Sequence, residues 1–156
     1  MWERRLRLLA APLRAVPVTV HSTVLAAVLN DALRSLRAGG ALDFLEGRVV
    51  ALMVEDAGLS CRLVYRRGRF AAAPAAASPA VTVCAGTATF IGLAARRLDY
   101  DSAFFARRLR IFGDTALGMR LRNVLDGVGE LPPPWRGVQG LLQRLAEHLA
   151  PGRAGA

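Results

Sequence analysis

Apolar and polar residues alternate most clearly between residues 104 and 126. Leu109 and Ile111 alternate with polar or aromatic residues, which predicts a short strand with one buried face. A glycine ends this strand, and Asp114 or Thr115 can cap the helix that follows. This region contains no evident nucleophile, general base or metal ligand, so it predicts an apolar wall and not a reaction centre. The helix carries an apolar stripe at spacings of three and four residues, formed by Leu117, Leu121, Val124, Leu125 and Val128.

The same periodicities predict the remaining elements. Ser22 can cap a helix over residues 21–36, which two glycines end. The run at 48–55 is apolar on both faces, which predicts a central strand that is covered on both sides. A hairpin turn then leads to a strand over 59–66 with one solvated face. The other expected elements are strands at 70–73 and 81–85, a helix opening at Gly86-Thr87, a short helix beginning at Asp99 or Asp101, and a last helix over 135–149.

Residues 1–16 have the pattern of a basic amphipathic helix, which Pro17 ends. Two interpretations of this helix are open. It packs on its own domain, or it lies on an anionic membrane surface with its tryptophan at the level of the lipid headgroups. The residues that would contact such a surface are Trp2, Arg4, Arg5, Leu6, Arg7 and Arg14.

Length and composition indicate one domain with a sizeable core. The chain of 156 residues divides into the helix at 1–16, a globular domain at 17–150 and a tail at 151–156 that is expected to be disordered. Hydrophobic residues make up 53% of the chain and aromatic residues 6%. Such an aliphatic composition suits the walls of a cavity and an ordinary core equally well. No apolar run approaches the ~18 residues that a membrane-spanning helix needs.

The charge balance favours anionic partners. The formal net charge is +9, and all 21 basic residues are arginines. Because these arginines are spread along the chain and no aromatic-rich nucleic-acid motif accompanies them, nucleic acid is not expected as a partner. Cys61 and Cys84 fall in predicted strands and are most simply free thiols of a reducing cytosol. Arg14 interrupts the apolar part of the N-terminus, which argues against a secretory signal.

No arrangement of residues indicates catalysis. The two histidines, His21 and His148, lie at opposite ends of the chain. Asp99 and Asp101 have no accompanying nucleophile, and no cysteine or histidine cluster has the spacing of metal ligands. The sequence therefore argues against an enzyme, and no cofactor is expected.

Three motifs carry a resemblance to a known family. They are ALDFLEGR at 41–48, LAARRLDYDSAFF at 93–105, and the pattern FF-x-RRL-x-I-x-GDT-x-LG-x-x-x-x-N-x-x-D at 104–126. In this order they resemble the family of the bacterial ubiquinone-biosynthesis accessory factor UbiT, which has a sterol-carrier-protein type-two domain. The resemblance spans residues 16–149. One departure is Phe112, where an acidic residue is expected before the Gly-Asp pair.

The resemblance implies both a fold and a function. The fold is α+β, a mixed five-stranded sheet packed with helices around an apolar tunnel. The implied function is non-catalytic binding of polyprenylated quinone precursors or another lipid in oxygen-independent ubiquinone synthesis. The implied partners are the iron–sulfur hydroxylase proteins UbiU and UbiV, and the implied location is the cytoplasm, peripherally on the inner membrane. The alternative is a protein-interaction scaffold of the same fold whose apolar groove binds a partner.

The expected cavity combines this fold with the apolar positions of the chain. The α-helical stripe after the Gly-Asp turn should line it together with parts of the last helix. The residues expected to line the cavity are Val50, Leu52, Val54, Phe90, Phe104, Phe105, Leu117, Leu121, Leu125, Leu141 and Leu145.

Overall fold

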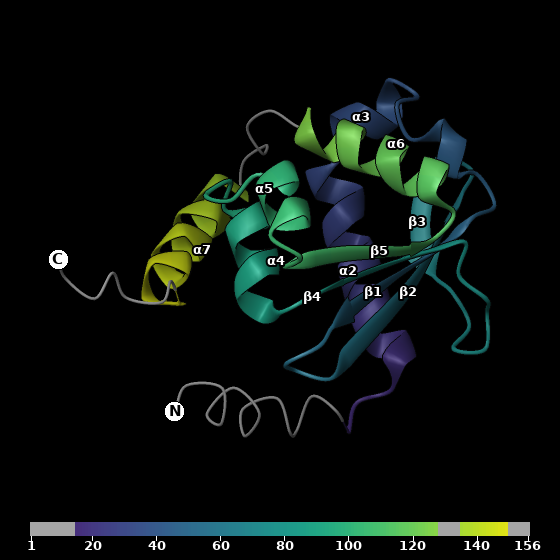
Figure 1. The fold of residues 1–156 in the computed structure, drawn as a ribbon. Coiled ribbons are helices and arrows are strands. Elements are labelled where there is room, and N and C mark those ends of the chain that lie inside the picture. Colours follow the sequence, from purple (N-terminus) through teal and green to yellow (C-terminus); the bar gives the residue numbers. More distant parts are fainter. Residues whose placement is uncertain (1–14, 128–134, 150–156) are drawn as a thin grey trace, which may run out of the picture.

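The computed structural model describes residues 15–127 and 135–149. The fold combines helices α2 to α7 with one five-stranded sheet in the order β3-β2-β1-β4-β5 (Figure 1). Most of the helix at 1–16 and all of the tail at 151–156 fall outside the described residues, so the expectations for them stay predictions. The elements are α2 (Val18–Ala32), α3 (Arg34–Ala38), β1 (Val49–Val54), β2 (Leu59–Arg66), β3 (Arg69–Ala72), β4 (Val81–Ala85), α4 (Thr87–Ala94), α5 (Tyr100–Phe105), β5 (Leu109–Gly113), α6 (Thr115–Asp126) and α7 (Trp135–Leu149), with a 3₁₀ turn at Asp43–Leu45.

The sheet is mixed, as the sequence predicts. Strand β1 lies at its centre, antiparallel to β2 and parallel to β4, and β5 pairs antiparallel with β4. The predicted fold class, α+β with a mixed five-stranded sheet and packed helices, is therefore confirmed. Strands β3 and β5 form the two edges.

The helices place two apolar clusters on one face of the sheet. Val50, Leu63 and Val81 pack with Leu117 of α6 and with residues of α2 in the larger cluster. Ala85 belongs to the smaller cluster, which α4 and α5 complete. Val81 and Ala85 are four positions apart on one strand, so both clusters use the same face. Figure 1 shows α6 running above β5 on this side of the molecule.

The opposite face of the sheet is less completely covered than the sequence predicts. On β1, Ala51 of this face is buried, but Met53 is 46% exposed. Phe112 of β5 shares the face and is 53% exposed. The prediction of a central strand covered on both sides is therefore wrong at Met53. A run of apolar residues does not reveal that one face of the strand reaches solvent, because methionine occurs both in the core and at the surface.

Helix α2 begins earlier than predicted, and Ser22 is not its cap. The helix starts at Val18, after Pro17. Ser22 lies inside it with no exposed surface, donates its hydroxyl to the Val18 carbonyl at 2.8 Å and accepts from the Arg62 backbone N–H at 2.9 Å. The hydroxyl therefore satisfies a backbone group of β2 that a neighbouring strand does not reach. The predicted single helix at 21–36 is divided at Leu33 into α2 and α3.

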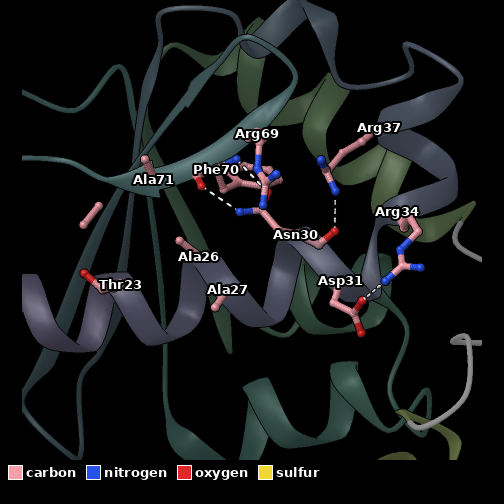
Figure 2. A pocket seen from close by; sticks show the side chains of 11 residues that line it. Thr23, Ala26, Ala27, Asn30, Asp31, Arg34, Arg37, Arg69, Phe70 and Ala71 are labelled. Carbon is pink, nitrogen blue, oxygen red and sulfur yellow. Dashed lines mark hydrogen bonds and ion pairs between the residues drawn. The ribbon is translucent and has the colours of Figure 1, made fainter.

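Asn30 closes the open edge of strand β3. Its amide nitrogen donates to the Phe70 carbonyl and its amide oxygen accepts from the Phe70 N–H, both at 2.8 Å (Figure 2). Arg37 adds a hydrogen bond from Nε to the Gly68 carbonyl at 2.8 Å. One side-chain amide thus takes the place of a neighbouring strand, and α2 protects an edge that could otherwise pair with another chain.

Replacing Asn30 by alanine is expected to lower the free energy of unfolding by about 1–3 kcal/mol, because it leaves both backbone groups of Phe70 without their partners. Urea denaturation followed by circular dichroism measures the change. The matched control is Asn123→Ala, at an exposed position of α6. Equal midpoints for the two variants would contradict the edge-closing role of Asn30.

Candidate functional site

Helix α6 forms the apolar wall that the sequence predicts. Asp114 is its N-cap, with a carboxylate oxygen that accepts from the Leu117 N–H at 3.0 Å, so the expectation of a cap at Asp114 or Thr115 is confirmed for Asp114. Leu117 is buried in the larger cluster. Leu121, Val124 and Leu125 are half-buried and pack against the same cluster. The stripe therefore faces the sheet and not bulk water.

The first half of α6 lies directly on the sheet. A Cβ atom added at Gly118 would lie 2.6 Å from Cγ2 of Ile111 and 3.4 Å from Cγ2 of Val81. A glycine is needed at this point for the helix to approach so closely. The accessible part of the wall is consequently the second half of the helix, where Leu121 and Leu125 keep part of their surface exposed.

The structure brings together several of the predicted cavity residues. Val50 and Leu52 of β1 lie in the larger cluster with Leu117, Leu121 and Leu125. Val54 is half-buried and, by strand alternation, shares their face. Phe90 packs separately, against the smaller cluster beside α4 and α5. Whether these surfaces enclose a tunnel stays a prediction.

Four of the predicted cavity residues lie on the surface of the described part of the chain, which corrects the expectation for them. Phe104 is 38% exposed and Phe105 80%. Helix α5 has six residues, of which Ala103 is fully buried and Tyr100 partly buried against the smaller cluster. On α7, Leu141 is 58% and Leu145 42% exposed. The sequence could not show this, because periodicity identifies the apolar face of a helix but does not tell whether another element packs on that face.

Helix α7 packs on α4. An ion pair joins Arg97 Nη2 to Glu147 Oε1 at 2.6 Å. Gln143 Nε2 lies 3.5 Å from the Ala95 carbonyl, at the end of α4. Two polar contacts therefore hold α7 at the C-terminal end of α4.

Tyr65 is a feature that the sequence analysis did not single out. It is 1% exposed, and its ring meets that of Phe70 edge-on with centroids 4.9 Å apart. Its hydroxyl has no hydrogen-bond partner among the residues that the structure describes. Burial raises the pKa of the Tyr65 phenol, and the nearby Asp43 carboxylate raises it further. The alternation along 59–66 places Tyr65 on the buried face, so the position, though not the unpaired hydroxyl, was available from the sequence.

Replacing Tyr65 by phenylalanine is expected to raise the free energy of unfolding by about 1 kcal/mol, because the change removes a buried hydroxyl that makes no hydrogen bond. Urea denaturation of the purified protein measures it. A lower midpoint for the variant would show that the hydroxyl has a partner, such as a buried water.

Comparisons with known proteins agree with this architecture. The model of the SCP-2 sterol transfer family matches residues 29–126, more than half of the chain. The ubiquinone biosynthesis accessory factors UbiT of Escherichia coli K12 and of E. coli O157:H7 are each 32% identical over 145 residues, which cover 93% of this chain and 82% of theirs. This chain belongs to the UbiT family. Its domain is one of the SCP-2 sterol transfer family.

A solved structure supports the fold of this UbiT family member. It is described as a UbiJ-SCP2 ubiquinone synthesis protein and matches with a TM-score of 0.54 at 21% identity. The match covers 65% of this chain and 90% of that one. At this identity the likeness shows the fold alone.

A positively charged cleft of about 600 Å³ lies between α2 and β3 (Figure 2). Arg34, Arg37 and Arg69 line it, with Asp31 as the acidic residue among them. Arg34 pairs with Asp31, and Arg37 also donates to the Asn30 carbonyl. Arg34 and Arg37 come from α3 and Arg69 from β3, so the cleft depends on elements that are distant in the sequence. Its charge suits an anionic group, but Arg37 already binds the Gly68 carbonyl beside the edge strand β3, and Arg34 already pairs with Asp31.

The described residues contain no set of three histidine, cysteine or acidic side chains that could hold a metal ion. Within the same residues, no helix has both the length and the apolar character needed to span a membrane. Cys61 on β2 and Cys84 on β4 are free thiols. Burial raises the pKa of both thiols, which keeps them protonated and poor nucleophiles at neutral pH.

Proposed function

We propose that this protein is a non-catalytic lipid-binding accessory factor of ubiquinone biosynthesis that sequesters polyprenylated precursors of the quinone. The observation that carries the proposal is the apolar wall of α6 in a chain 32% identical to UbiT over 93% of its length. The name of that relative places it in ubiquinone biosynthesis, and the matched family is named for sterol transfer. Ubiquinone and sterols are both large apolar molecules.

The physical basis of binding is the removal of a prenyl tail from water. Burial of each carbon group of the tail contributes about 0.8 kcal/mol, so one isoprene unit contributes up to ~3–4 kcal/mol. An aliphatic wall such as that of Leu121, Val124 and Leu125 therefore needs no polar chemistry to bind well. We expect affinity to depend on the tail and to change little with the headgroup.

The finer parts of the proposal rest on the family resemblance. They are a role in oxygen-independent synthesis, cooperation with UbiU and UbiV, and a cytoplasmic protein peripherally associated with the inner membrane. The net charge of +9 supports contact with an anionic membrane surface. Trp2, Leu6 and the arginines of the first 16 residues are the proposed contacts at the N-terminus.

Organic extraction of the purified protein, followed by mass spectrometry, tests the proposal. The protein should be prepared from cells grown with and without oxygen, beside an unrelated soluble protein purified in the same way. We expect prenylated aromatic lipids to be enriched over the control, most strongly without oxygen. An extract with no lipid, or with the composition of the bulk membrane, would contradict the proposal.

The alternative function is a scaffold of a ubiquinone-biosynthesis complex whose apolar groove binds a partner. The exposed Leu141 and Leu145 of α7 favour it, since they offer an apolar face that a partner could cover. The same extraction separates the two functions, because a scaffold would carry a protein and not a prenylated lipid.

A further inference from the structure

Three of the six phenylalanines of the chain lie exposed around one end of the sheet. Phe104 and Phe105 end helix α5 and are 38% and 80% exposed, and Phe112 of β5 is 53% exposed. Aromatic side chains of this size are normally buried in soluble proteins. A group of them at the surface marks an interaction site.

The three rings share one surface hollow. They line a cleft of about 490 Å³ together with Arg107, Arg110 and two residues of β5. The rings of Phe104 and Phe105 meet edge-on with centroids 5.9 Å apart. The guanidinium of Arg110 lies 5.9 Å from the centre of the Phe112 ring. We call the set Phe104, Phe105, Arg107, Arg110 and Phe112 the aromatic–arginine patch.

The charge around the patch has one predominant sign. Arg107, Arg108 and Arg110 are all exposed. Among the described residues, Glu55 is the acidic side chain seen to pair with one of them, Arg110. The surplus agrees with the net charge of +9 for the whole chain. An occupant of the patch should therefore be anionic and also offer an apolar layer.

The edge strand itself argues against a protein strand as the occupant. β5 is an outer strand of the sheet with five residues, and exposed arginines stand within and beside it. A short edge carrying charged side chains is a common protection against pairing with another strand. Anionic lipid headgroups above a hydrocarbon layer match both the arginines and the rings.

We propose that the aromatic–arginine patch docks on an anionic membrane, with its phenylalanine rings below the headgroups and its arginines on the lipid phosphates. This contact is separate from the N-terminal residues that the sequence singles out. It deepens the proposed function, since a protein that binds prenylated lipids must collect them from a bilayer. The patch lies at the edge strand β5, two strands away from the central strand β1, and it does not include the accessible residues Leu121 and Leu125 of α6.

Flotation of the full chain with vesicles tests the patch. The vesicles are phosphatidylcholine alone, or phosphatidylcholine mixed with phosphatidylglycerol. We expect Phe105→Ser combined with Phe112→Ser to lower partitioning onto the mixed vesicles by roughly tenfold or more. Val24→Ser is the matched control, since Val24 is an apolar residue 60% exposed on α2, and it should bind as the unaltered chain does. Raised salt should weaken all binding.

A second variant reports on insertion directly. Phe105→Trp should show a blue-shifted emission on addition of the mixed vesicles, measured as the difference from the unaltered chain, which contains two tryptophans of its own. The proposal would be overturned if the Phe105→Trp emission shifted no more than that of the unaltered chain. It would also be overturned if the serine variant floated as well as the unaltered chain. A wild-type dimer that the serine variant converts to a monomer would overturn it too, because the patch would then be a protein interface.

The two proposals fail separately. Extraction of the flotation variants measures the lipid that each protein carries, whereas flotation measures the contact of the patch with the membrane. Loss of flotation with unchanged lipid content supports the patch and leaves the lipid-binding function intact. Normal flotation of a chain that carries no prenylated lipid would count against the function and would not concern the patch.

Discussion

Replacing Gly113 by alanine is expected to destabilise the protein by about 2–5 kcal/mol, more than any other single methyl group added to the turn before α6. Gly113 has a φ of +93°, which L side chains rarely adopt. A Cβ atom there would lie 2.5 Å from the Ala80 carbonyl oxygen and 3.3 Å from the Val81 Cα. Both are backbone atoms, at the start of strand β4 and the residue before it, so neither can rotate away.

The position is fixed from both sides. Gly113 pairs with Val81 in the β4–β5 ladder, and the next residue, Asp114, donates its N–H to the same Ala80 carbonyl at 2.8 Å. The carboxylate of Asp114 then caps α6. A methyl group at Gly113 would therefore displace the end of β5 and the start of the apolar wall together.

Gly47→Ala is the matched control for this prediction. Gly47 has a φ of +72°, but no atom lies within 4 Å of an added Cβ. The Gly47→Ala variant should lose about 1–2 kcal/mol of its free energy of unfolding, which is the cost of the left-handed conformation alone. Urea denaturation of both variants separates that cost from the close approach. Equal losses of stability in the two variants would show that the β4–β5 junction accommodates the added methyl group at little cost.

Much of the fold follows from local signals. The period-two pattern of β5, the Gly-Asp turn and the stripe of α6 are all recovered in the structure, because each depends on residues close in sequence. The caps at Asp99 and Asp114 are recovered for the same reason, since both accept from an N–H three residues later.

Features that depend on distant neighbours were not available from the sequence. Ser22 looks like a helix cap but serves the backbone of Arg62, 40 residues away. The start of α4 is held by Asp56 in the same manner, since its carboxylate accepts from the N–H and the hydroxyl of Thr87 at 2.8 Å. Neither contact can be predicted from the spacing of residues along the sequence.

The candidate site shows the same division. Periodicity identified the wall of Leu117, Leu121 and Leu125 because a helix turns at a fixed rate. It could not decide the environment of Phe104 and Phe105, because a helix of six residues is too short for its periodicity to define a buried face. The structure places these rings outside, where they form a surface instead of a cavity.

Leu121→Glu is expected to remove the lipid that co-purifies with the protein. Leu121 is half-buried and packs on the larger apolar cluster, in the half of α6 that remains accessible. A carboxylate at this point would meet aliphatic side chains and a prenyl tail. It would either stay charged at a large desolvation cost or take up a proton through a raised pKa, and both weaken binding.

The matched control for Leu121→Glu is Asn123→Glu, which adds the same charge to the exposed side of the same helix. Mass spectrometry of the extracted lipid, normalised to protein, should fall to background for Leu121→Glu and stay unchanged for Asn123→Glu. Circular dichroism and thermal unfolding show whether each variant is folded, and Leu121→Asn provides a milder polar change if the first variant is not. A folded Leu121→Glu protein that carries as much prenylated lipid as the unaltered chain would place the binding surface elsewhere than on α6.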